Sequence, residues 1–226
     1  MDPTVVLLIL TAAVNPAMAG FVKPPPSTTP GGFVVEYFAI GSNMKEEVMT
    51  KRRRITPVAP ARPAVAPNHE LTFDVPGLSV LEPAFAAIKP NEGRECHGVL
   101  YTLTPADWLR LLASEGVPLA YRPVPLTVEC YDGRRVEAMS LGVGAGIPTA
   151  QFRGTRKGVD DVAEIQPRPS QRYLNLLREG ARESGLAATW VEYLEGLQPA
   201  PGSADAPNSR PQTKRNYEQR PGATFI

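Results

Sequence analysis

Runs and alternations of apolar residues along the chain predict several β-strands. Residues 34–40 form an almost continuously apolar run rich in aromatic and β-branched side chains, which is typical of a buried strand. Leu71, Phe73 and Val75 alternate with polar residues, as expected of a strand with one buried face. Further strands are predicted at residues 84–88, 96–103, 125–130 and 136–141.

Two sequences between these strands are typical of hairpin turns. Residues 91–93, Asn-Glu-Gly, follow a proline and separate two apolar runs. Asp132-Gly133 is a strong signal for a tight turn. We therefore predict that both are hairpin turns in one antiparallel sheet. The proline-rich residues 57–67 cannot be helical, so an extended, edge or loop segment is expected there.

Capping residues and periodic apolar positions predict three helices. Thr104 is a good N-cap with Asp107 three residues further on, and this helix should end at Glu115-Gly116. A second helix is expected to begin at Ser170 and to end at Gly185, because glycine often follows the last helical turn. A short last helix is predicted over residues 190–197.

The sequence Gly41-Ser42-Asn43 predicts a turn between the first strand and a helix. Asn43 suits an N-cap, and Glu46 three residues on completes a capping-box pattern. Such a turn directs unpaired backbone N–H groups at one point, which favours a carboxylate or a developing oxyanion. The alternative is a capped tight turn without a ligand. The basic residues 51–54 that follow are expected to form a solvent-exposed helix end.

Composition changes the picture at the two ends of the chain. The 226 residues include 25 prolines, concentrated outside the periodic segments, which predicts disordered or extended ends. We expect a leader and linker over 1–32, one folded domain over 33–198 and a disordered tail over 199–226. Residues 1–19 resemble a cleaved leader but lack a basic start, so a cytoplasmic location is favoured while a secretory or organellar one stays open. The apolar run 5–14 is too short for stable membrane insertion.

Charge and side-chain inventory argue against several functions. The 24 Lys and Arg are balanced by 23 Asp and Glu, which argues against a nucleic-acid-binding surface. Cys96 and Cys130 fall in predicted strands, so two buried thiols are expected rather than a disulfide or a zinc site. Only His69 and His97 are available as histidines, so no metal site built from several histidines and no Ser-His-acid triad are expected. Catalysis would depend on carboxylates, tyrosines, hydroxyls and backbone groups.

Glu115 is the candidate catalytic residue on physical grounds. It lies at the C-terminal end of a predicted helix, where the helix dipole disfavours a negative charge. A sheltered carboxyl group at such a position suits both accepting and donating protons. The alternative is an exposed glutamate at a helix end.

Three blocks, in chain order, resemble the γ-glutamylcyclotransferase family. Residues 37–44, YFAIGSNM, resemble its Tyr-Phe-Ala-Tyr-Gly-Ser-Asn signature. Residues 98–101 and 108–117 resemble its strand and its helix ending in Glu-Gly-Val, and its C-terminal helix block is matched by residues 169–174, 180–186 and 190–194. The resemblance covers roughly residues 34–197. It implies an α+β fold, a small mixed and closed or nearly closed β-barrel with helices packed outside.

The resemblance also implies a cofactor-free reaction on a small-molecule γ-glutamyl substrate. The α-amine of the substrate attacks its own γ-carbonyl, releasing 5-oxoproline and a free amino acid or amine. Glu115 is implied as the general acid/base. The residues implied to bind the substrate are Ile40, Gly41, Ser42, Asn43, Tyr121 and Tyr173. For the two tyrosines, half-buried aromatics without a role in binding are the alternative.

Two departures from the family pattern keep other functions open. Ile40 stands where the signature has tyrosine, and Leu141 falls where another pocket tyrosine is expected. Both make the expected pocket more apolar, which favours an altered leaving group such as an amine, or a non-catalytic ligand-binding or regulatory protein of the same fold. Glutathione is less favoured, because the signature is not the Tyr-Gly-Ser-Leu type. An interaction protein acting through its proline-rich ends and residues 51–54 is a further alternative. Either a monomer or a homodimer is compatible with these patterns.

Overall fold

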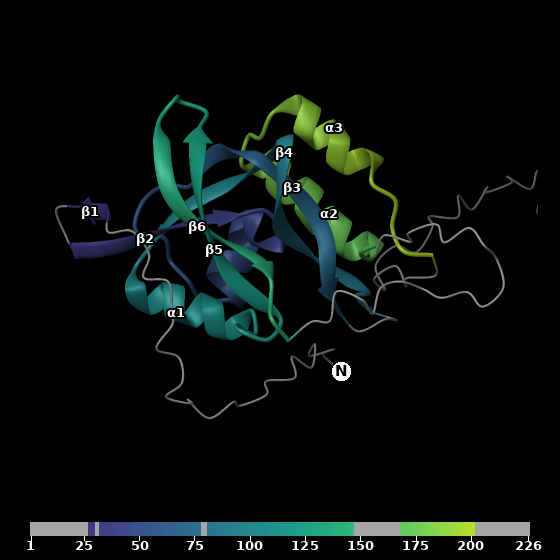
Figure 1. Ribbon diagram of the computed structural model, residues 1–226, viewed down its shortest axis with the longest axis horizontal. Coiled ribbons are helices and arrows are strands. Elements are labelled where there is room, and N and C mark those ends of the chain that lie inside the picture. Colours follow the sequence, from purple (N-terminus) through teal and green to yellow (C-terminus); the bar gives the residue numbers. More distant parts are fainter. Residues whose placement is uncertain (1–26, 30–31, 78–80, 147–167, 202–226) are drawn as a thin grey trace, which may run out of the picture.

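The computed structural model describes residues 27–29, 32–77, 81–146 and 168–201 (Figure 1). Most of the predicted leader and of the predicted tail lie outside these residues. The strands are β1 Ser27–Thr29, β2 Gly32–Ala39, β3 Arg62–Pro76, β4 Ala84–Leu103, β5 Tyr121–Cys130 and β6 Arg135–Val143. The helices are α1 Pro105–Ser114, α2 Gln171–Glu183 and α3 Ala188–Gly196, with a 3-10 turn η1 at Ser42–Met44 and a π-helical turn η2 at Val48–Arg52.

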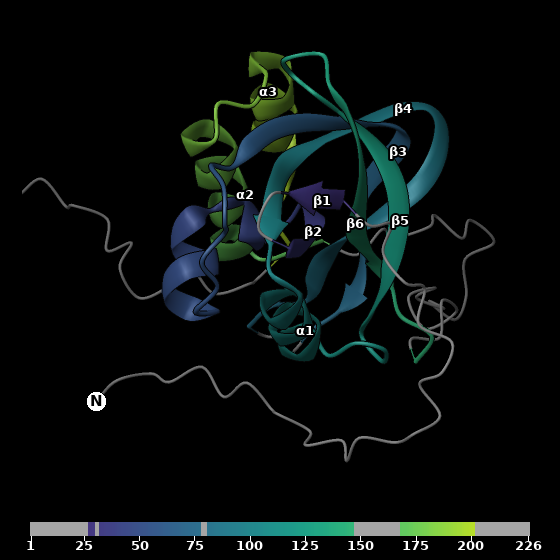
Figure 2. The ribbon, with the colours of Figure 1, turned by 90° about the vertical axis from the view of Figure 1, so that its left-hand side faces the viewer.

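The strands form one curved sheet that returns on itself. Their order is β1-β2-β4-β3-β5-β6, with antiparallel neighbours throughout. The last strand, β6, then pairs in parallel with β2 at Tyr37 and Met139. Helices α2 and α3 pack on one side of this sheet and α1 lies on another (Figure 2). The predicted α+β class, a mixed sheet with helices outside it, is confirmed.

Strands β3 and β4 form one long ribbon, and this corrects the predicted turn at Asn91 to Gly93. Strand β4 runs through that segment without reversing, so the strands predicted at 84–88 and 96–103 are one strand. Pairing stops at Pro67 with Glu95 and resumes at His69 with Pro90, so residues 91–94 bulge opposite Asn68. The Gly93 N–H donates to Asn68 Oδ1 at 3.0 Å, so the bulge is hydrogen-bonded to the opposite strand.

The turn at Asp132-Gly133 and the predicted ends of α1 and α2 are confirmed, whereas α3 covers 188–196 rather than 190–197. The β5–β6 hairpin turns at Asp132-Gly133, where Gly133 has a positive φ of 87°. Helix α1 begins at its N-cap Thr104 and ends with Glu115 as its C-cap. In α2, Ser170 accepts a hydrogen bond from the Tyr173 N–H, so it is the N-cap that was predicted. The proline-rich residues 57–67 are partly extended, because β3 begins at Arg62.

Packing at the end of β2 brings three separate parts of the chain together. Gly180 in α2 lies so close to η1 that a Cβ there would be 2.7 Å from the Lys45 backbone nitrogen. Helix α1 packs against β2 through Trp108, whose ring centroid is 5.9 Å from that of Tyr37. The core between these elements contains Phe38, Leu100, Leu111, Met139, Leu174 and Leu177. The C-terminal ends of β2 and α1 and the N-terminal turn of α2 therefore meet at one place.

The cysteine prediction can be compared with the structure, whereas the apolar run 5–14 lies outside the described residues. Cys96 and Cys130 are both buried free thiols, as predicted. Within the described residues, none of the helices is long and apolar enough to span a bilayer.

Candidate active site

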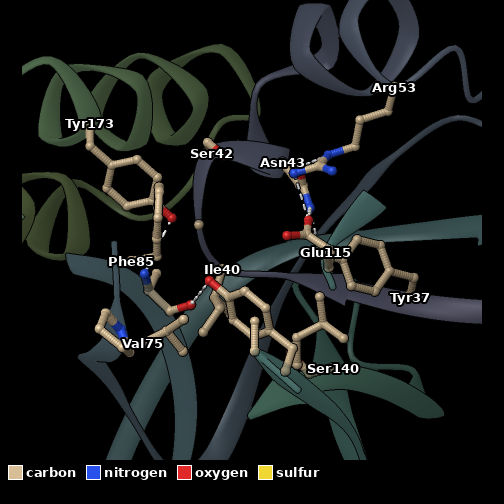
Figure 3. Close-up of a pocket in the computed structure, with 16 residues that line it drawn as sticks. Tyr37, Ile40, Ser42, Asn43, Arg53, Val75, Phe85, Glu115, Ser140 and Tyr173 are labelled. Atoms are coloured by element: carbon tan, nitrogen blue, oxygen red, sulfur yellow. Dashed lines mark hydrogen bonds and ion pairs between the residues drawn. The ribbon is translucent and has the colours of Figure 1, made fainter. Parts of the chain in front are cut away.

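A cavity of about 230 Å³ lies where β2 ends, between α1 and α2 (Figure 3). All seven residues predicted to form the site line it, and they come from three distant stretches of the chain. Its lining comprises Tyr37, Ile40, Gly41, Ser42, Asn43, Arg53, Val75, Pro76, Phe85, Ala86, Glu115, Ala120, Tyr121, Ser140, Leu141 and Tyr173.

The turn after β2 differs from the prediction. Asn43 is not a helix N-cap, since η1 begins after Gly41 and has no side-chain cap, and η2 follows Glu47. The Asn43 side chain is buried and points into the protein, where it has three polar partners. These tertiary hydrogen bonds take the place of the local cap that the sequence pattern favoured. The N–H groups of Ser42 and Asn43 donate to no other backbone group of the described residues.

Asn43 is the centre of a polar network on one side of the cavity. Its Nδ2 donates to Tyr37 Oη at 2.9 Å and to Glu115 Oε1 at 2.8 Å. Its Oδ1 accepts from Arg53 Nε at 2.6 Å. Burial and the nearby Glu115 charge raise the pKa of Tyr37, so this phenol stays neutral and can accept the Asn43 hydrogen bond. The network fixes the position of each member by at least one bond to another member.

Arg53 is a site residue that the sequence analysis missed. Its Nη2 lies 2.6 Å from Glu115 Oε1, and its side chain is only 17% exposed. The prediction of a solvent-exposed basic run is therefore wrong for Arg53, although Lys51, Arg52 and Arg54 are exposed. A run of four basic residues gives no signal by which one of them could be singled out. Only the backbone path between β2 and β3 determines which one turns inward.

Glu115 presents one free oxygen to the cavity. Its side chain is 12% exposed, which does not fit the alternative of an exposed helix-end glutamate. Oε1 is occupied by Asn43 and Arg53, while Oε2 has no hydrogen-bond partner among the described residues. Figure 3 shows the second oxygen pointing into the cavity, towards the side where Tyr173 lies. A carboxylate with one oxygen held and the other free is suited to proton transfer.

Two tyrosines form the other side of the cavity, and both hydrogen-bond to the backbone of Ala86. Tyr121 Oη donates to the Ala86 carbonyl at 3.0 Å, and the Ala86 N–H donates to Tyr173 Oη at 3.2 Å. The β3–β4 register shifts between Thr72 and Val75, so Ala86 is outside the regular ladder and its backbone groups are available. Burial raises the pKa of Tyr121 and raises that of Tyr173 to about 12, so both are neutral hydroxyls.

Gly41 allows the turn to approach Tyr173 closely. A Cβ at this position would lie 2.8 Å from Tyr173 Oη and 3.2 Å from the Ala86 Cβ. The φ of Gly41 is −106°, which other residues adopt readily, so the requirement for glycine is one of space. Ile40 and Leu141 are each 5% exposed and add apolar surface to the lining.

These groups are suited to acid–base chemistry beside an oxygen that gains negative charge. Glu115 supplies the ionisable group, and the Tyr173 hydroxyl and the turn N–H groups supply neutral donors. Among the described residues, no group of three or more His, Cys, Asp and Glu is placed to hold a metal ion.

Sequence comparisons identify similar proteins. The AIG2-like family matches residues 95–194. The γ-glutamyl cyclotransferase aclK of Aspergillus oryzae is 29% identical over 182 residues, which cover 74% of this chain and 62% of that protein. The γ-glutamyl cyclotransferase gliK of Claviceps purpurea is 31% identical over 157 residues, covering 67% of this chain and 64% of that protein. The chain thus spans less than two thirds of the length of these relatives.

Solved structures share the fold. A structure described as a γ-glutamyl cyclotransferase matches with a TM-score of 0.62 and 20% identity, over 77% of this chain and 94% of that one. An uncharacterized protein from Homo sapiens matches over the same shares, with a TM-score of 0.60 and 20% identity. The arrangement of sheet and helices is therefore shared with these structures.

Proposed function

Since the chain belongs to the γ-glutamylcyclotransferase family, we propose that it converts a γ-glutamyl amide into 5-oxoproline and a free amino acid or amine. The observation that carries this proposal is the free Oε2 of Glu115, which shares one cavity with the Gly41–Asn43 turn. A cyclisation needs little else, because nucleophile and electrophile belong to the same substrate molecule.

The reaction conserves atoms without a second reactant. The α-amine nitrogen attacks the γ-carbonyl carbon and forms the ring C–N bond, while the bond from that carbon to the leaving nitrogen breaks. Glu115 Oε2 takes the proton from the α-amine and passes it to the leaving nitrogen. Neither water nor an oxidant is consumed. Holding the substrate in a folded-back conformation contributes several kcal/mol, roughly, through proximity alone.

The opposite side of the cavity would bind the carbonyl oxygen or the substrate carboxylate. The Asn43 N–H has no backbone acceptor among the described residues, while the Ser42 N–H is directed at the neutral Tyr173 hydroxyl, which lies beside Gly41. Fixed donors stabilise an oxyanion better than mobile water does, because they need no reorganisation during the reaction. Tyr121 gives its proton to the Ala86 carbonyl, so we assign it to holding the cavity wall. Ile40 would contact the apolar part of the substrate.

A non-catalytic ligand-binding protein of the same fold is the second candidate. The observation that favours it is the presence of Ile40 and Leu141, both buried in the lining, where the family pattern leads us to expect tyrosines. Two hydroxyl groups are therefore replaced by apolar surface. Such a cavity could keep a γ-glutamyl ligand without turning it over.

A panel of γ-glutamyl amino acids, amines and peptides separates the two candidates. We expect the purified protein to release 5-oxoproline from at least one member, measured by chromatography. Glu115→Gln should abolish most of that release, while Glu92→Gln, which changes an exposed glutamate, should not. If no member of the panel is cyclised but calorimetry detects binding, the non-catalytic function is correct and the cyclotransferase proposal is wrong.

A further inference from the structure

We propose that Arg53 is a positioning residue for the acid/base Glu115, holding its Oε1 so that Oε2 alone transfers protons. This inference rests on the proposed function, because it assigns a role within the same reaction. It concerns a residue that neither the sequence pattern nor the family signature singled out. Three observations support it: the partners of Arg53, the backbone that directs it inward and the charge that it brings to Glu115.

Each of the three guanidinium nitrogens of Arg53 contacts a protein acceptor. Nη2 contacts Glu115 Oε1 at 2.6 Å, and Nε donates to Asn43 Oδ1 at 2.6 Å. Nη1 donates to Ser114 Oγ at 2.5 Å, and Ser114 is the last residue of α1, directly before Glu115. The planar fork of an arginine can hold three such acceptors at fixed angles, which a lysine ammonium cannot do. Arg53 is thus committed to orienting Glu115 and its helix end.

The backbone before Arg53 has an uncommon geometry that turns this side chain inward. The π-helical turn η2 is closed by the Arg53 N–H, which donates to the Val48 carbonyl at 3.0 Å. The next residue, Arg54, has a φ of 56°, which is rare for a residue other than glycine. Turns of the π type and left-handed residues other than glycine cost stability and occur frequently at functional sites. Here they separate the half-buried Arg53 from its exposed neighbours Arg52 and Arg54.

The charge of Arg53 acts on both halves of the proton transfer. The guanidinium lies against Glu115 Oε1, so Oε2 is the oxygen left to take a proton from the α-amine and to return it. That return goes to the leaving nitrogen, which must be protonated before it departs. Among the described residues, the other titratable groups that face Glu115 are phenols kept neutral by burial, Tyr37 from β2, Tyr121 from β5 and Tyr173 from α2. Arg53 is therefore the cation that offsets the Glu115 charge.

Arg53→Met and Arg53→Lys test this role, with Arg52→Met as the matched control on the exposed neighbour. The measurement is 5-oxoproline release from the best substrate of the panel, as kcat and KM over a range of pH. We expect Arg53→Met to lower kcat by roughly tenfold to a hundredfold, because the acid/base is displaced, with a smaller change in KM. Arg53→Lys keeps the charge but not the planar fork, so it should recover part of kcat.

Thermal unfolding of the parent, Arg53→Met, Glu115→Gln and the double variant tests the same contact without a substrate. Residues in contact are energetically coupled, so the double variant should lose less stability than the two single losses combined. Strictly additive losses, or an Arg53→Met variant with the kcat and KM of Arg52→Met, would overturn the inference. Absence of 5-oxoproline from the parent itself would overturn the proposed function instead, and the unfolding cycle would still decide whether Arg53 holds Glu115.

Discussion

The two walls of the cavity are held in place by different forces. The charged wall consists of Tyr37, Asn43, Arg53 and Glu115, joined by side-chain hydrogen bonds and one ion pair. The tyrosine wall consists of Tyr121, Ala86 and Tyr173, in which two neutral phenols bind one backbone unit. The first wall contains a group that can change its charge, whereas the second contains only groups that stay neutral.

This difference indicates how each wall contributes. The charged wall can carry protons, and its stability depends on keeping a shielded cation and anion together, since either one alone is costly. The tyrosine wall keeps the turn, β4 and α2 at fixed distances through hydrogen bonds of about 1 kcal/mol each and close contacts. Substitutions in the charged wall should therefore change turnover most, and substitutions in the tyrosine wall should change stability relatively more.

Glu115→Gln should have the largest effect on turnover. Glutamine keeps the size of the side chain but cannot carry the proton, so 5-oxoproline release should fall by at least about a hundredfold. Ligand affinity should change much less, because the Gly41–Asn43 turn is intact. Stability should fall by roughly 1–3 kcal/mol, because Arg53 loses its counter-ion. Kinetic assays and thermal melts measure both effects, and an active parent with an equally active variant would remove Glu115 from the mechanism.

Gly41→Ala should be the next largest change and should affect both walls. The added methyl would overlap Tyr173 Oη and press on Ala86, so the turn and the tyrosine wall must move apart. We expect a loss of about 1–3 kcal/mol in stability and about a tenfold loss in turnover. Gly196→Ala is the matched control, since a Cβ there has no neighbour within 4 Å. If Gly41→Ala changed neither stability nor turnover, the turn would tolerate a larger distance from Tyr173.

Tyr173→Phe and Tyr121→Phe sharpen the comparison within the tyrosine wall. Each leaves one buried group of Ala86 without its partner, so each should cost about 1–3 kcal/mol in thermal or denaturant unfolding. Turnover should fall more in Tyr173→Phe, because Tyr173 accepts from Ala86 and keeps its own proton for the substrate, whereas Tyr121 donates its proton to the wall. Tyr193→Phe controls for loss of an exposed hydroxyl. Equal kinetic effects at 121 and 173 would contradict this division.

The smallest predicted effect concerns Glu82, which holds the helix that carries Tyr173. Its buried carboxylate accepts from the N–H and Oγ of Ser170, the N-cap of α2, at 2.8 and 2.5 Å. Burial raises the pKa of Glu82, so the folded protein binds this proton more tightly than the unfolded chain does. The stability that this raised pKa contributes is complete below the ordinary glutamate pKa. It is lost as pH rises through the pKa of Glu82 in the folded protein.

Glu82→Gln removes this titratable group, so it tests whether the contribution to stability falls as pH rises. The melting temperature of the parent relative to the variant should be highest in acid and should decline as pH rises towards neutrality. Glu92→Gln, at an exposed position, should show no such trend. A difference between parent and Glu82→Gln that is constant with pH would show that Glu82 does not titrate differently on unfolding.

Elements with strong local chemistry could be predicted from the sequence. Thr104, Ser170 and Gly185 mark helix ends through bonds to their own helices, and Asp132-Gly133 defines a turn by its backbone preferences. The resemblance of three blocks in chain order predicted that Glu115 faces the Gly41–Asn43 turn. In the structure, both line the same cavity. The chemical roles of these residues stay predictions.

Features decided by distant partners could not be predicted. Residues 91–93 have good turn chemistry, yet β3 pairs on both sides of them and makes them a bulge. Asn43 has good capping chemistry, yet Tyr37, Arg53 and Glu115 provide three interior partners. Arg53 looks like its neighbours until the backbone of η2 is known.

The π-helical turn at Val48–Arg52 makes the spacing of this segment more important than its composition. One inward arginine and three exposed basic residues coexist in 51–54 because this turn is one residue wider than an α-helical turn. A single-residue deletion within 48–50 would keep every arginine and the net basic character, yet it would rotate the run by about 100° and carry Arg53 away from Glu115. The segment should therefore tolerate exchange of its exposed side chains far better than any insertion or deletion.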